Sequence, residues 1–122
     1  MLFLLVAVFA DPCLSSSGKY YIPVGTNGKP AVYTRYNANF ACRGASNSGV
    51  AGDTTALNVE LGNLLTTCNP PNKSGWVSSW NTDTYGGAPI YLTPAYNAPA
   101  NSYTIVSAWG PEQTIAVICA KA

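Results

Sequence analysis

The chain has no histidine among its 122 residues, and only 9% of its residues are charged. Without histidine, the Ser-His and Cys-His pairs that activate many catalytic nucleophiles are excluded. The net charge is +1 and no basic patch is present, so we expect no nucleic-acid partner. The four cysteines lie too far apart in the sequence for a zinc pair, so we also expect no metal and no cofactor.

Long apolar runs are absent except at the start, where residues 1–10 are uninterruptedly apolar. This run is too short to cross a bilayer, which needs roughly 20 residues. It is typical of a secretory signal peptide cleaved after Ala10, and the alternative is a buried N-terminal strand. We therefore expect a secreted, extracellular mature chain, residues 11–122, that forms one domain and has no membrane association.

All four cysteines lie within the expected mature chain, at Cys13, Cys42, Cys68 and Cys119. An even number of cysteines after a signal peptide predicts two disulfide bonds. Four cysteines can pair in three ways, and the sequence pattern leaves all three open.

The densest group of aromatic residues lies in residues 75–92, with two Trp and two Tyr residues. Trp76, Ser78 and Trp80 alternate with Val77 and would share one face of a strand. Residues 81–87 carry turn-forming residues, and a strand can resume over 88–92. We interpret this stretch as the middle of the core, with Trp76 buried.

The clearest predicted helix spans residues 53–68, with Asp53 as a plausible N-cap. One apolar stripe runs along it, formed by Leu57, Leu61, Leu64, Leu65 and Cys68. Gly62 weakens this helix by about 1 kcal/mol relative to Ala. The sequence Asn69-Pro70-Pro71 ends it.

The remaining segments alternate between short strands and loops. Strands are expected over residues 19–23, 31–35, 103–107 and 114–119, a short helix over 36–43, and loops over 13–18 and 94–102. Asn27-Gly28 favours a hairpin turn, and the last strand is apolar enough to be central in a sheet. The predicted class is α+β, with segregated helices.

The order of these landmarks resembles a C-type lectin-like domain. Ala41-Cys42 matches the first helix, residues 57–68 the second, Trp76-Val-Ser-Ser the Trp-Ile-Gly strand, and Val117-Ile-Cys119 the closing strand. The run from Trp76 to Ala88 also resembles a stretch that recurs in small, uncharacterised secreted fungal proteins. The C-type lectin-like resemblance implies two helices against a small, mostly antiparallel sheet. It also implies a Cys42–Cys119 bond, which leaves Cys13–Cys68 as the second bridge.

Sugar-binding members of that family hold calcium with Glu-Pro-Asn or Gln-Pro-Asp and with Trp-Asn-Asp. At the nearest positions this chain has Ala88-Pro-Ile and Ser107-Ala-Trp-Gly. A calcium site needs six to eight oxygen ligands, and this region offers only the carboxylates of Asp83 and Glu112. Any binding is therefore expected to be independent of calcium.

The family presents its long loop for binding, and residues 81–87 and 94–102 are its counterparts. We expect any ligand to contact Trp80, Asp83 and Tyr85, with Tyr96 and Asn101 on the rim. The alternative for Asp83 is a turn-capping role. Asn72-Lys73-Ser74 is the single glycosylation motif, so Asn72 is expected to carry a glycan if the host glycosylates.

The leading functional hypothesis is a secreted, non-catalytic module that binds an extracellular glycan or protein. The second is a structural or cell-surface coat protein without a small ligand. A polysaccharide-acting enzyme ranks lowest, because such enzymes use two carboxylates and nothing marks a partner for Asp83. The sequence indicates no oligomeric state.

Overall fold

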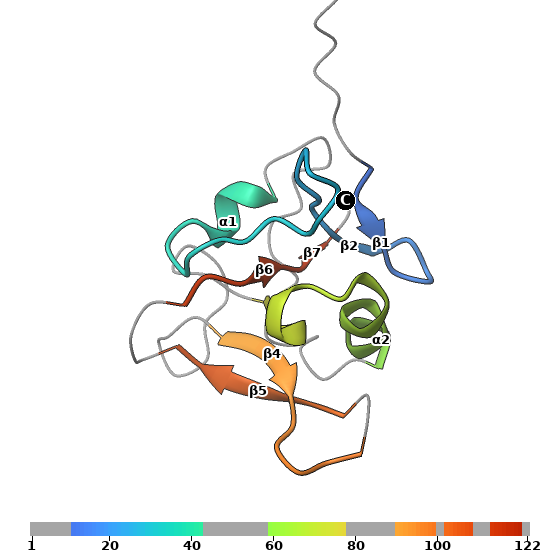
Figure 1. Cartoon of the computed structure of the whole chain (residues 1–122), viewed down its shortest axis with the longest axis vertical. Helices are drawn as coiled ribbons and strands as arrows, with labels where there is room; N and C mark the ends of the chain where they lie inside the picture. The colour runs from blue at the N-terminus through green and yellow to red at the C-terminus, as the bar shows by residue number, and fades with distance from the viewer. Residues whose placement is uncertain (1–10, 43–58, 78–89, 100–101, 109–112, 121–122) are drawn as a thin grey trace, which may run out of the picture.

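The computed structural model describes residues 11–42, 59–77, 90–99, 102–108 and 113–120 (Figure 1). Its elements in chain order are β1 (Cys13–Leu14), β2 (Tyr20–Ile22), α1 (Ala38–Ala41), α2 (Val59–Cys68), the 3-10 turn η2 (Pro71–Lys73), β3 (Gly75–Trp76), β4 (Ile90–Pro94), β5 (Tyr103–Ser107), β6 (Ala116–Val117) and β7 (Cys119–Ala120). The class is therefore α+β, as the sequence predicts. The expected signal peptide, the expected N-cap Asp53 and the expected turn at 81–87 lie outside the described residues.

The strands form two small sheets. The larger has the order β5-β4-β3-β6, with β3 and β6 parallel and the other neighbours antiparallel. The smaller has the order β1-β2-β7 and is antiparallel. The expected single central strand at 114–119 is wrong, because β6 belongs to the larger sheet and β7 to the smaller. Between them, the backbone N–H of Ile118 donates to the carbonyl of Trp76 at 2.9 Å.

Strands β3 and β6 and the first half of β4 are buried on both faces of the larger sheet, so successive residues belong to different clusters. Trp76 and Val77 are both fully buried but belong to different clusters. The cluster that we call the α2-side core contains Ile22, Leu61, Leu64, Leu65, Val77, Ile90, Leu92, Ala116 and Ile118. The α1-side core contains Tyr21, Ala38, Cys42, Trp76, Tyr91, Ala108, Ile115, Val117 and Cys119. Figure 1 shows α1 and α2 separated in the same way by the strand β6.

Helix α2 follows the predicted apolar stripe where it is described. Leu61, Leu64 and Leu65 are buried in the α2-side core, and Cys68 packs against it. The exposed side chain of Asn63 lies off the stripe, as its polarity requires. Burial of this stripe is the main reason why a ten-residue helix with an internal glycine persists.

The segment between β2 and α1 differs from the expected hairpin. The turn itself forms, because Gly25 N–H donates to the Lys29 carbonyl at 2.8 Å and Gly28 adopts a φ of 79°. The expected strand at 31–35 is wrong, since this segment makes only an isolated bridge between Tyr33 and Ile115. The Tyr33 carbonyl also accepts the indole N–H of Trp76 at 2.8 Å. Two backbone hydrogen bonds between Tyr33 and Ile115, together with the bond from Trp76, therefore hold this segment without a strand ladder.

Two further expectations need correction near the N-terminus. The expected helix at 36–43 is only the single turn α1, and the side chains of Tyr36 and Phe40 are exposed. The expected loop at 13–18 begins with a strand, because β1 pairs with β2 through Leu14 and Tyr21. Residues 13–14 form a strand and not a loop because their backbone can pair with the edge of β2.

Two disulfide bonds fasten these elements together. Cys13–Cys68 joins β1 to the end of α2, and Cys42–Cys119 joins the end of α1 to β7. This is the pairing that the C-type lectin-like resemblance implies. Within the part of the chain that the structure describes, no helix has the length and apolar character needed to cross a membrane.

Candidate functional site

The loop between β4 and β5, residues 95–102, is presented by the most extensive strand pairing among the described residues. Five residue pairs join β4 to β5, and the last of them is Pro94 with Tyr103. The loop is then closed by the Ala95 N–H, which donates to the Ser102 carbonyl at 2.8 Å. Asn97 adopts a φ of 54°, a conformation that asparagine tolerates better than most residues. The described part of the loop is therefore a defined turn on a rigid hairpin.

Tyr96 lies in this turn with 92% of its surface exposed. An exposed tyrosine ring can stack on an apolar face of a ligand while its hydroxyl stays hydrogen-bonded. Of the five predicted ligand-contact residues, Tyr96 is the one that lies within the described residues. Trp80, Asp83, Tyr85 and Asn101 lie outside them.

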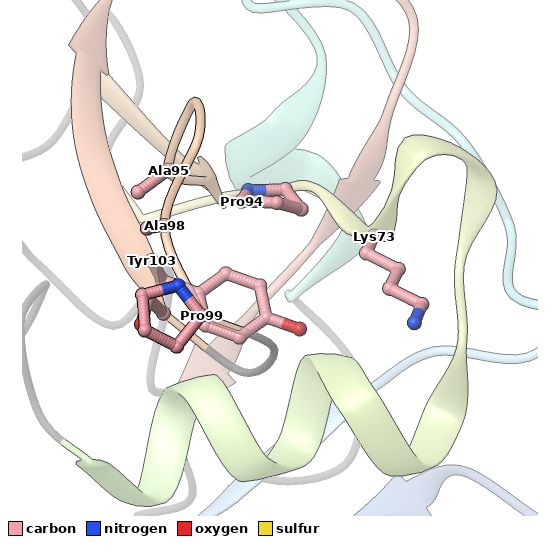
Figure 2. A pocket seen from close by; sticks show the side chains of 7 residues that line it. Lys73, Pro94, Ala95, Ala98, Pro99 and Tyr103 are labelled. Atoms are coloured by element: carbon pink, nitrogen blue, oxygen red, sulfur yellow. The ribbon is translucent and has the colours of Figure 1, made fainter.

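The base of the loop borders a hollow of about 210 Å³, which Ala95 lines and Tyr96 does not (Figure 2). Its lining residues come from the loop, from the ends of β4 and β5, and from η2: Lys73, Pro94, Ala95, Ala98, Pro99, Ser102 and Tyr103. Figure 2 shows Pro99 and Tyr103 on the hairpin side and Lys73 on the opposite side. A volume of this size accommodates one ring-sized group rather than a whole drug-sized ligand.

Tyr103 is held rigidly at the wall of this hollow. Its hydroxyl lies 2.8 Å from the Thr66 hydroxyl, which itself donates to the Gly62 carbonyl at 3.0 Å. Because a threonine hydroxyl has one proton, the Tyr103 hydroxyl is the donor to Thr66. The aromatic wall is thus fixed against α2 before any ligand arrives.

Lys73 is positioned by backbone geometry that few residues adopt. Asn72 and Lys73 have φ values of 57° and 49°, and the Lys73 N–H donates to the Pro70 carbonyl at 2.8 Å. Lys73 is the one charged side chain among the described residues that line the hollow. Its ammonium can donate up to three hydrogen bonds to ligand oxygens.

The other described aromatic residues of the predicted cluster belong to the core. Trp76 is fully buried, as expected. Its ring packs edge to face against that of Tyr91, with 5.4 Å between the ring centroids. The Tyr91 hydroxyl accepts a hydrogen bond from the Gln113 amide at 3.0 Å. These contacts stabilise the α1-side core and leave no part of either ring for a ligand.

The described carboxylates are not arranged for acid–base catalysis. Glu60 accepts hydrogen bonds from the backbone N–H of Ser17, at 2.9 Å, and from the Ser17 hydroxyl. Bonds from the side chains of Ser15 and Ser17 hold the pKa of Glu60 below its usual value. Glu60 therefore stays ionised and ties α2 to the β1–β2 turn. Among the residues described, no three His, Cys, Asp or Glu side chains are grouped to hold a metal ion.

Sequence reasoning identified the loop but missed part of its surroundings. Tyr103 was expected in a strand, and nothing in the local pattern indicates that its ring faces η2. Lys73 follows two prolines and an asparagine, and these residues predict a turn. They do not predict that Tyr103 lies across the hollow from Lys73. The pairing of these residues depends on how α2 packs against β5.

Comparison of the chain with protein-family models, with curated proteins and with solved structures finds no match. The candidate site therefore rests on its own geometry.

Proposed function

We propose that the chain is a secreted, non-catalytic binding module that recognises an extracellular glycan through the β4–β5 loop. The observation that carries the proposal is Tyr96, 92% exposed on a closed turn whose residues Ala95, Ala98 and Pro99 line the hollow together with Lys73 and Tyr103. Tyr96 would stack on an apolar face of the ligand, and Lys73 would donate to hydroxyl or carbonyl oxygens.

The scaffold has the properties that such a module needs. Two disulfide bonds in a chain of this size are typical of proteins that work in oxidising compartments. They restrain β1, α1, α2 and β7, and the five residue pairs between β4 and β5 restrain the ends of the loop, so the loop loses little freedom on binding. A rigid surface of this kind binds without the entropic cost of ordering the loop.

The chemistry of the surface favours a neutral, hydroxyl-rich ligand. Proline, alanine and tyrosine side chains dominate the hollow, and Lys73 adds a single positive charge. An anionic polymer would need several cationic side chains at the same surface. We therefore favour a neutral glycan, bound without calcium, over an anionic one.

We further propose the C-type lectin-like fold as the specific architecture. The support is the order of α1, α2, a Trp-containing strand and a closing strand, together with the bond from Cys42 to Cys119. In that fold the loop after the Trp strand forms the binding end, and the β4–β5 loop follows β3 here.

The test is a glycan array probed with the folded, disulfide-bonded protein. Tyr96→Ala should weaken binding to any positive glycan by about 30-fold, which corresponds to about 2 kcal/mol for a contact anchor. The control is Tyr36→Ala, since Tyr36 is a half-exposed tyrosine that lies in the segment before α1 and does not line the hollow. Circular dichroism should show both variants folded.

Other results would assign a different role. Equal loss of binding in both variants would show that Tyr96 is not a specific contact. A silent array combined with capture of one protein from the natural extracellular surface, lost in Tyr96→Ala, would replace the glycan with a protein partner. No binding of either kind would favour the structural coat protein, and turnover of a polysaccharide would favour an enzyme.

A further inference from the structure

A second hollow lies on the other side of the turn η2. It is an open groove of about 730 Å³ between the turn that follows β2 and the turn that follows α2. Its lining residues are Asn27, Gly28, Lys29, Pro30 and Val32 from the first turn, and Cys68, Asn69, Pro70, Pro71 and Asn72 from the second. We call it the Asn72 groove. We propose that Asn72 carries an N-linked glycan whose first sugars lie in this groove.

The acceptor residue itself forms part of the groove wall. Asn72 is exposed and is the asparagine of the single Asn-x-Ser/Thr motif in the chain. Its φ of 57° places it at the tip of a tight turn. A sugar attached at this position stays next to the groove at a high effective concentration, so even weak contacts keep it docked.

The groove matches the two kinds of surface on N-acetylglucosamine. Pro30, Pro71 and Val32, which is 40% exposed, offer apolar contacts to the sugar ring and the acetamido methyl group. Asn27 and Asn69 offer amide groups to the sugar hydroxyls. The Asn27 side-chain oxygen already accepts the Lys29 N–H at 3.0 Å, so Asn27 presents its NH₂ group as a donor.

The fold also determines when the modification can occur. The motif requires the hydroxyl of Ser74, but Ser74 is only 2% exposed. Its hydroxyl donates to the Asn72 carbonyl at 3.0 Å and lies 2.7 Å from the Thr93 hydroxyl on β4. A transferase can reach this hydroxyl only before η2 and β4 come together. The glycan is therefore added to the unfolded chain and settles into the groove afterwards.

The transfer is a substitution without a change of oxidation state. A bond forms between the Asn72 Nδ2 and the anomeric carbon of the first sugar of a lipid-linked oligosaccharide diphosphate. The bond from that carbon to the diphosphate oxygen breaks, and the lipid diphosphate leaves with the electron pair. The amide proton passes to a base of the transferase.

The first experiment compares the full chain from a glycosylating secretory host with the same chain from a bacterial periplasm. Mass spectrometry should show the glycan at Asn72, and the glycosylated protein should melt about 6 °C higher. Val32→Ser should abolish this gain because it removes an apolar contact of the groove. Leu14→Ser should keep it, since Leu14 is comparably exposed but does not line the groove. An unmodified Asn72, or an equal gain in both variants, would overturn the proposal.

A second measurement holds even if Val32→Ser fails to fold. An endoglycosidase that cuts after the first sugar should act roughly tenfold more slowly on the folded wild type than on the reduced, unfolded protein, as a ten-to-one docked population requires. Equal rates would show that the sugars are free in solvent. In a microsomal assay, the folded bacterial protein should not accept a glycan, whereas the reduced chain should. Acceptance by the folded protein would contradict the proposed order of events.

Discussion

The aromatic ring of Tyr103 lies where a side chain at Gly62 would have to be placed. A Cβ atom built on Gly62 would lie 3.0 Å from the Tyr103 Cδ2 atom. Helix propensity alone predicts that Gly62→Ala stabilises α2 by about 1 kcal/mol. Because the Tyr103 hydroxyl is bonded to Thr66, the ring cannot move aside freely.

We therefore expect Gly62→Ala to destabilise the protein by about 1 kcal/mol, since overpacking costs about 1–3 kcal/mol and exceeds the gain in propensity. Urea unfolding monitored by circular dichroism measures this free energy. Asn63→Ala is the matched control, because Asn63 is exposed on the same helix and its replacement should stabilise by about 0.5 kcal/mol. Stabilisation by both substitutions would mean that the Tyr103 ring is not fixed.

The Glu60 carboxylate should make stability depend on pH. Its pKa is lowered in the folded protein by hydrogen bonds from Ser15 and Ser17, so the folded state favours the ionised form. This contribution is present above the unfolded pKa, near 4.5, and is lost as the pH falls through the lower folded value. Glu60→Gln should therefore melt below the wild type at pH 7, and the difference should shrink below about pH 4.5.

Two serine variants test the source of that effect. Ser17→Ala removes one hydroxyl donor and should reproduce part of the pH-dependent loss. Ser16→Ala, an exposed neighbour, should leave the melting curve unchanged at every pH. A Glu60→Gln difference that is constant with pH would instead indicate lost packing.

The two disulfide bonds should differ in their resistance to reduction. Cys42 and Cys119 are fully buried in the α1-side core, whereas Cys13 and Cys68 are partly exposed. Thiol exchange requires access to a sulfur atom, so limited reductant should open Cys13–Cys68 first. Alkylation followed by peptide mapping identifies the order, and early labelling of Cys42 would contradict it.

The buried bridge should also contribute more to stability. Its 77-residue separation constrains the unfolded chain by about 4–5 kcal/mol in the chain-entropy model. Replacing Cys42 and Cys119 together by alanine should lower the free energy of unfolding by at least that amount, because the replacement also leaves space in the core. Replacing Cys13 and Cys68 together, as the control, should cost less.

Ligand binding at the β4–β5 loop should depend little on ions. A neutral glycan bound as proposed would contact the loop through stacking and desolvation, and salt screens neither. For the glycan selected on the array, raising the salt from 0.05 to 0.5 M should change the Kd by less than about threefold. Excess chelator should leave both the Kd and the melting temperature unchanged. A melting temperature that rises with calcium would contradict the calcium-independent module.

Several local features could be predicted from the sequence. Leu61, Leu64 and Leu65 form the buried stripe of α2, and the strand predicted over residues 103–107 coincides with β5. The Asn27-Gly28 turn forms as expected. These features depend on side-chain periodicity and on turn-forming residues, which act over a few neighbouring positions.

The loop with Tyr96 could likewise be identified, but the composition of the hollow could not. Lys73 and Tyr103 are thirty positions apart in the sequence. They line the same hollow because Gly62 has no side chain, which allows the Tyr103 ring to pack against α2. No local signal distinguishes a glycine that permits such an approach from one that only weakens a helix.

The sequence by itself determined the number of disulfides to expect, the amphipathic helix and the strand over residues 103–107, because local chemistry specifies them. Only the tertiary structure decided that residues 114–120 divide between two sheets and that β3 and β6 run parallel. It also decided that Tyr33 meets Ile115 and Trp76 without forming a strand. Apolar patterning shows that a residue is buried, whereas its partner is selected by contacts among segments distant in the chain.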